Sequence, residues 1–91
     1  MKKRSFIARL TDIHPSGKDK QLWVFEFMYD DGRTTICPWT KEKKLVKKAE
    51  KLLFKPCRAT VLMTEEYGWH DKLISLTRVT EQKLAEAEEN Y

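Results

Sequence analysis

Alternating apolar and polar residues at the start of the chain predict a β-strand followed by a loop. Between Ser5 and Thr11, every second residue is apolar on one side: Phe6, Ala8 and Leu10. A period of two is typical of a half-buried strand. The stretch Asp12–Gln21 has no such period and is rich in lysine, proline, glycine and serine, which indicates a loop.

The next segment predicts a β-hairpin. Leu22–Tyr29 is rich in aromatic and β-branched residues, and Asp30–Gly32 supplies the residue types that a tight turn favours. A third strand is expected over Arg33–Cys37. Pro38 is expected to end it, because proline has no N–H to donate to a continuing ladder.

A helix is predicted after this hairpin. Thr40 can accept hydrogen bonds from the free N–H groups of a first helical turn, so it is the expected cap. The following apolar residues recur at helical spacing and predict a helix of about three and a half turns. These residues are Leu45, Val46, Ala49, Leu52 and Leu53.

Two more strands and a short helix complete the pattern. Pro56 prevents the first helix from continuing, and alternation over Cys57–Thr64 predicts a fourth strand. A loop over Glu65–Asp71 then precedes a fifth strand over Lys72–Val79. Thr80 is placed to cap a C-terminal helix.

This order of elements resembles the OB-fold, and in particular the nucleic-acid-binding OB domains of single-strand-binding and replication proteins. The resemblance lies in Trp23–Phe27 before the hairpin turn, Ile36–Trp39 before the helix, and Arg58–Val61 leading to Leu73–Val79. It implies a mainly β fold, a five-stranded OB-fold barrel with a helix between strands three and four. The barrel would span residues 1–80, with an acidic C-terminal helix or tail over 81–91. The glycine usual in strand one is absent, so a bulge must supply its curvature.

The charge along the chain suggests a polyanionic partner. Lysine and arginine exceed aspartate and glutamate by 18 to 14, for a net charge of +4. Residues 1–80 carry 17 basic and 10 acidic side chains, a net charge of +7, whereas the last eleven residues carry −3. A basic body of this kind fits nucleic acid.

Several classes of protein are excluded on composition. The chain has no apolar run long enough to span a bilayer and no signal-peptide core, so a cytoplasmic location is expected. Cys37 and Cys57 are too few for a disulfide scaffold, and no CxxC or HxxxH spacing suggests a metal. Because no nucleophile, base or metal set converges, we expect no enzymatic activity and no cofactor.

The resemblance implies a ligand lying across strands two and three, between the two loops predicted above. Exposed aromatic rings can stack on unpaired bases, and cations can pair with phosphates. In strand two, Glu26 should face outward, which places Phe25 and Phe27 in the core. Trp23 and Tyr29, at the strand ends, fit either the core or the rim, and Tyr67 and Trp69 either stack on bases or cover the open end of the barrel. The predicted stacking residues are Trp23, Tyr29, Tyr67 and Trp69, and the predicted phosphate-binding residues are Arg9, Lys18, Lys20, Arg33, Arg58 and Lys72.

The expected function is binding of single-stranded nucleic acid, with DNA favoured over RNA and little sequence specificity, as an accessory in DNA replication, recombination or a mobile element. One small domain covers few nucleotides, so a homodimer is a further expectation. The acidic end resembles tails that recruit replication or recombination proteins, although an ordinary terminal helix also fits it. The alternative function is a protein-binding adaptor or inhibitor, for which Leu22, Val24 and Met28 would form an outer apolar surface.

Overall fold

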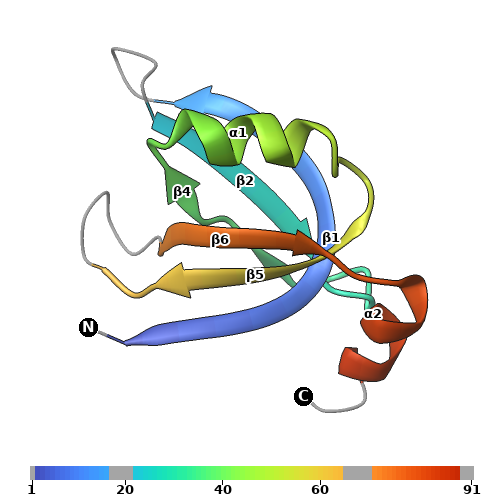
Figure 1. Ribbon diagram of the computed structural model, residues 1–91. Coiled ribbons are helices and arrows are strands. Elements are labelled where there is room, and N and C mark those ends of the chain that lie inside the picture. Colours follow the sequence, from blue (N-terminus) through green and yellow to red (C-terminus); the bar gives the residue numbers. More distant parts are fainter. Residues whose placement is uncertain (1, 17–21, 65–70, 89–91) are drawn as a thin grey trace.

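The computed structural model describes residues 2–16, 22–64 and 71–88, and it is mainly β, as the sequence predicts (Figure 1). One helix lies between the predicted third and fourth strands, which are β3–β4 and β5 in Figure 1, and a second helix follows the last strand. Both predicted helices are therefore confirmed. The strands are β1 (Lys3–Ser16), β2 (Leu22–Met28), β3 (Thr35–Ile36), β4 (Trp39–Thr40), β5 (Pro56–Leu62) and β6 (Lys72–Arg78), and the helices are α1 (Lys43–Glu50) and α2 (Glu81–Glu88).

The strands form one mixed sheet whose pairings close into a ring. The order is β1-β5-β6-β4-β2-β3, and β1 pairs additionally with β2. β4 and β6 run parallel, while the other pairs are antiparallel. Figure 1 shows β1 as a long curved strand that bends around the other strands. Its first half pairs with β5 and its second half with β2.

A β-bulge at Thr11 accompanies the bend of β1. Leu10 lies opposite Phe27 and Asp12 lies opposite Glu26, so Thr11 is the extra residue. The Thr11 hydroxyl contacts the Glu26 main-chain oxygen at 3.1 Å and its carboxylate Oε1 at 2.9 Å. An extra residue of this kind increases local twist, which supplies curvature in a strand without glycine.

The expected loop over Asp12–Gln21 is wrong for its first five residues. Residues 12–16 continue β1 and pair with β2 as far as Ser16 opposite Leu22. The bulge explains the failed prediction, because it shifts the alternation by one residue. Ile13 therefore packs on the core while Asp12 is exposed.

The third strand does not end at Pro38. It is interrupted there and resumes as β4, so the sheet has six strands where five were expected. Proline lacks a donor but keeps its carbonyl, and the Pro38 oxygen accepts a hydrogen bond of 2.9 Å from the Phe25 N–H. Trp39 and Thr40 then pair with Val24 and Trp23 of β2.

Thr40 does not cap α1, and the helix is shorter than predicted. The side chain of Thr40 is fully buried in β4, and its hydroxyl accepts a bond of 3.1 Å from the Glu42 N–H. α1 begins only at Lys43, and turns follow it after Glu50. Pairing of β4 with β2 holds Thr40 in the sheet, so its hydroxyl stabilises the turn before the helix.

The core lies inside the ring of strands. Phe25 and Phe27 are completely buried, as the outward position of Glu26 predicted. The rings of Phe6 and Phe27 pack edge to face, with their centroids 5.3 Å apart. The buried residues of α1 are Leu45, Val46 and Ala49, and the helix packs against β6 and β1. Leu22, expected on the outer surface, is buried at 9% exposure.

The C-terminal helix is docked on the sheet. The Thr80 hydroxyl accepts a bond of 3.1 Å from the Lys83 N–H, which confirms it as the cap. Leu84 is 2% exposed, and α2 contacts β1 and β5 (Figure 1). Neither helix within the described residues is long and apolar enough to cross a membrane.

The connection from α1 to β5 contains a strained residue. Phe54 has φ of 67°, a left-handed conformation, although its ring is 64% exposed. Its N–H donates to the Leu10 oxygen at 2.6 Å, which holds this conformation in place. Left-handed backbone costs a residue with a Cβ atom more than it costs glycine.

Phe54→Gly is therefore expected to be more stable than Phe54→Ala by about 0.5 to 1 kcal/mol. Both variants remove the exposed ring, but only glycine removes the Cβ atom that makes the conformation unfavourable. The difference is reduced by the larger conformational entropy of glycine in the unfolded chain. Urea unfolding of the two variants measures it. A glycine variant less stable than the alanine variant would show that the left-handed conformation carries no such cost.

Candidate nucleic-acid interface

The predicted site residues that the structure describes lie in two groups at opposite ends of β2, with Arg58 elsewhere. Trp23 lies near the start of the strand, whereas Arg9, Tyr29 and Arg33 lie near its end. Seven residues of strand span about 20 Å. Four predicted residues lie outside the described part of the chain: Lys18, Lys20, Tyr67 and Trp69.

At the first end, Trp23 and Lys72 flank β4. Trp23 pairs with Thr40, and Lys72 pairs with Trp39 across the parallel ladder. Trp23 is half-buried and packs against the core, so one part of its indole remains accessible. The Lys72 ammonium lies 5.8 Å from the centroid of the Trp39 ring, a cation–π contact.

At the second end, Arg9 and Tyr29 line a pocket of about 160 Å³, which α2 closes with Leu84. The Arg9 guanidinium makes a two-pronged ion pair with Glu81, at 2.9 Å and 2.5 Å. It also donates to the Phe54 carbonyl at 3.0 Å. The hydrogen bonds between Arg9 and Glu81 raise the pKa of Arg9 and lower the pKa of Glu81. Arg9 therefore holds α2 against the sheet, and a phosphate would have to compete with a carboxylate for it.

Tyr29 and Arg33 lie on either side of an acidic turn. Tyr29 is half-buried, and its ring packs edge to face with the ring of Phe6, with the two centroids 6.0 Å apart. Asp31 accepts bonds of 2.8 Å from the N–H groups of Arg33 and Thr34. The Thr34 hydroxyl and these main-chain donors lower the pKa of Asp31, so its carboxylate stays charged. Arg33 is exposed, but a carboxylate lies two residues before it.

Carboxylates occupy the surface between the two ends of β2. Asp12 and Glu26 lie directly opposite each other across β1 and β2. His14 is 2.9 Å from Asp12, through Nδ1. Two carboxylates on neighbouring strands repel phosphate, so the face across β1 and β2 is a poor continuous track for a nucleic-acid backbone. The residues described by the structure contain no group of three or more His, Cys, Asp and Glu able to hold a metal ion.

A different face of the sheet carries cations and hydroxyls without carboxylates. We call it the β1–β5–β6 outer face, and it is defined by side chains that alternate with the buried positions of these strands. Pairing brings Ser5 beside Thr60, with their hydroxyl oxygens 2.9 Å apart, and Thr60 beside Ser75. Its members are Lys3, Ser5, Ile7, Arg58, Thr60, Leu62, Lys72, Ser75 and Thr77.

Arg58 lies on β5, the middle strand of this outer face, in the row nearest the start of that strand. It is exposed, pairs with Ile7 on one side and Thr77 on the other, and forms no ion pair with any described residue. Of the predicted phosphate-binding residues that the structure describes, Arg58 and Lys72 are members of this face, and both strand partners of Arg58 are uncharged. Arg58 was a predicted phosphate-binding residue, but Ser5, Thr60 and Ser75 were not. Only the strand register brings these three hydroxyls together, so no local sequence pattern indicates them.

The two thiols offer no reactive group near this face. Cys57 is completely buried, and burial raises its pKa to about 11. Burial also raises the pKa of Cys37, and Glu26 and Asp12 add to the effect. Both cysteines are free and protonated near neutral pH.

Comparisons with known proteins give no relative from which to transfer a function: the chain matches no protein-family model, no curated protein and no solved structure.

Proposed function

We propose that this protein is an OB-type barrel that binds single-stranded nucleic acid. The support for the fold is the order of its pairings. Taking β3 and β4 as one interrupted strand, strand one pairs with strands two and four, and strand three runs parallel to strand five. The helix lies between strands three and four. OB-folds bind oligonucleotides across strands two and three, whereas the face proposed below lies on strands one, four and five.

The observation that carries the binding proposal is the β1–β5–β6 outer face. Lys3, Arg58 and Lys72 supply positive charge, and the four hydroxyls supply hydrogen-bond donors to phosphate oxygens. No carboxylate interrupts the positions that define this face. We therefore assign the phosphate backbone to it, and not to the acidic surface between Asp12 and Glu26.

A single strand is a better ligand for this surface than a duplex. Both helices within the described residues pack along the sheet, so neither projects as an element that would enter a major groove. Cations and hydroxyls contact the backbone and read little sequence. Unpaired bases remain available to stack on the accessible part of Trp23. We propose single-stranded DNA as the first ligand to test, in a replication, recombination or mobile-element context.

The protein-binding alternative has less support. Its outer apolar surface needs Leu22, Val24 and Met28, but Leu22 is buried and Val24 and Met28 are half-buried. The remaining apolar surface on β2 is interrupted by Glu26.

Arg58→Glu is expected to weaken binding of single-stranded DNA about tenfold or more at low salt, because it replaces a cation with a carboxylate on the middle strand of the proposed phosphate-binding face. Loss of one phosphate contact should also reduce the slope of log affinity against log salt concentration by about 0.7. Fluorescence anisotropy of labelled single-stranded DNA, single-stranded RNA and duplex DNA, at about 50 and 200 mM salt, measures both quantities.

The matched control is Lys47→Glu, which makes the same change in net charge on the exposed side of α1. We expect it to alter the affinity much less than Arg58→Glu. Equal effects of the two variants would indicate a general charge effect and would remove the assignment to the outer face. Absence of binding by the wild-type protein to all three nucleic acids at low salt would reject the proposed function itself.

A further inference from the structure

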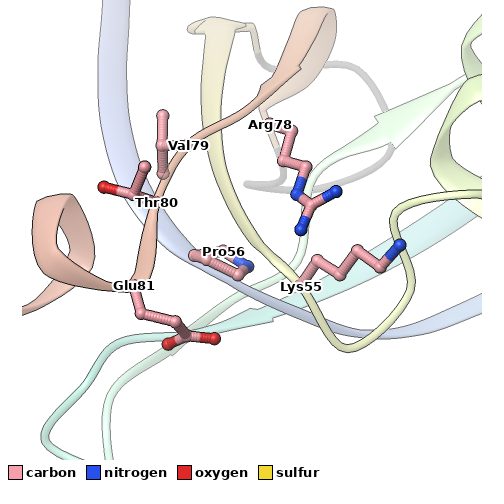
Figure 2. A pocket seen from close by; sticks show the side chains of 6 residues that line it. All are labelled: Lys55, Pro56, Arg78, Val79, Thr80 and Glu81. Atoms are coloured by element: carbon pink, nitrogen blue, oxygen red, sulfur yellow. The ribbon is translucent and has the colours of Figure 1, made fainter.

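A second basic site lies at the end of the sheet, beside the start of α2. It is a pocket of about 350 Å³, near the lower limit for small-ligand sites. The chain enters β5 on one side of it and leaves β6 on the other (Figure 2). Its size suits a small ligand or the terminal group of a larger one. The residues that line it are Lys55, Pro56, Arg78, Val79, Thr80 and Glu81.

Lys55 and Arg78 give the pocket two positive charges. Neither forms an ion pair with a residue in the described ranges, in contrast to Arg9. Figure 2 shows their cationic ends on the same side of the pocket, with Glu81 on the opposite side. The charge of Glu81 is balanced by its ion pair with Arg9. The lining therefore matches a ligand of charge −2.

Main-chain hydrogen bonds and strand pairing fix the backbone of both Lys55 and Arg78. The Lys55 N–H donates to the Leu52 oxygen at 3.0 Å, and the Lys55 oxygen accepts from the Leu10 N–H at 3.2 Å. The backbone of Arg78 is fixed by strand pairing with Cys57, and Cys57 lies two residues after Lys55. Because main-chain hydrogen bonds and strand pairing fix these backbone positions, binding has to order only the two side chains.

We propose that this pocket binds a phosphate monoester. The planar Arg78 guanidinium can pair with two phosphate oxygens, and Lys55 adds a second charge. A monoester carries close to two negative charges at neutral pH, whereas an internal phosphodiester carries one. The monoester can belong to a free nucleotide or to the phosphorylated end of a nucleic-acid strand.

The position of the pocket connects the second of these sources to the proposed function. Cys57 and Arg78 are strand partners, and the next pair along the two strands is Arg58 with Thr77, which belongs to the outer face. Because neighbouring residues of a strand point to opposite faces, a strand whose phosphorylated end enters the pocket has to pass over the end of the sheet, a short path, to reach the β1–β5–β6 outer face. This part of the inference rests on the proposed function, whereas binding of a free phosphate monoester does not.

Two titrations of the full chain test the proposal and separate it from the proposed function. The first compares oligonucleotides of one sequence, about 8 nucleotides long, that end in a 5′-phosphate, a 3′-phosphate or hydroxyls only. We expect one terminal phosphate to increase affinity about tenfold. The second follows the NMR signals of Lys55 and Arg78 during addition of inorganic phosphate and of a nucleoside monophosphate.

The variant Lys55→Gln/Arg78→Gln should abolish the gain from the terminal phosphate and leave binding of the hydroxyl-ended strand within about twofold of wild type. Arg78→Lys keeps the charge and should give an intermediate gain, which separates a loss of binding from a loss of folding. Lys44→Gln/Lys48→Gln on exposed positions of α1 is the control with the same charge change and should keep the full gain.

If no oligonucleotide binds but free phosphate or nucleotide shifts the Lys55 and Arg78 signals, the pocket stands and the proposed function fails. If oligonucleotides bind with equal affinity whatever their ends, and neither free compound shifts these signals at millimolar concentration, the pocket proposal is overturned and the proposed function survives.

Discussion

Phe27→Ala is expected to lower the free energy of unfolding by about 3 to 5 kcal/mol. Phe27 is completely buried in β2, and its ring packs edge to face with Phe6 of β1. Truncation removes buried apolar area and the edge-to-face contact, and leaves a cavity that paired strands cannot close. Because small domains are stable by only about 5 to 15 kcal/mol, this is a large fraction of the total.

Urea or thermal unfolding monitored by tryptophan fluorescence measures this loss, and Phe54→Ala is its matched control. The same atoms are removed at position 54, but that ring is 64% exposed. We expect the control to change stability by less than about 1 kcal/mol. Similar losses for the two variants would mean that Phe27 does not lie in the packed centre of the sheet.

Leu84→Ala is expected to detach α2 from the sheet. Leu84 is the buried residue of this helix, at 2% exposure. Truncating a buried leucine to alanine lowers the free energy of unfolding by about 2 to 5 kcal/mol. α2 has eight residues, and isolated helices shorter than about 12 residues are marginal in water. The loss should therefore appear first as local unfolding of α2, with a smaller effect on the strands.

Hydrogen exchange of individual amides distinguishes local from global unfolding. Amides of α2 should lose protection in Leu84→Ala, while those of β5 and β6 keep most of theirs. Gln82→Ala is the control on the same helix: Gln82 is exposed, and its change should stay within about 0.5 kcal/mol. Unchanged protection of α2 in Leu84→Ala would show that other contacts hold the helix.

The Arg9–Glu81 ion pair links α2 to the interpretation of the surface. Arg9 is a predicted phosphate-binding residue, but its guanidinium is shared between Glu81 and the Phe54 carbonyl. On the sheet, the positive charge available to a ligand therefore lies on Arg58 and its neighbours and at Lys55 and Arg78, while the exposed lysines of α1 form a separate basic surface. The experiments on the outer face and on the pocket address these two locations separately.

Local patterns in the sequence determined much of the secondary structure and core. Alternation placed Phe25 and Phe27 inside and predicted β5 and β6 nearly to their ends. The Thr80 cap was also predictable, because a cap depends on residues within one helical turn. Each of these features follows from side-chain periodicity or from contacts between close neighbours in the chain, so one sequence suffices to find it.

Only the tertiary structure decided which charges lie together. The bulge at Thr11 places Asp12 opposite Glu26, pairing of three strands brings Ser5, Thr60 and Ser75 into one row, and docking of α2 brings Glu81 to Arg9 across 72 positions of sequence. The physical reason is that strand register and helix docking are set by closure of the whole sheet, and a shift of one residue exchanges the two faces of a strand. Composition indicates a basic protein, but the closed sheet decides which of its surfaces is basic.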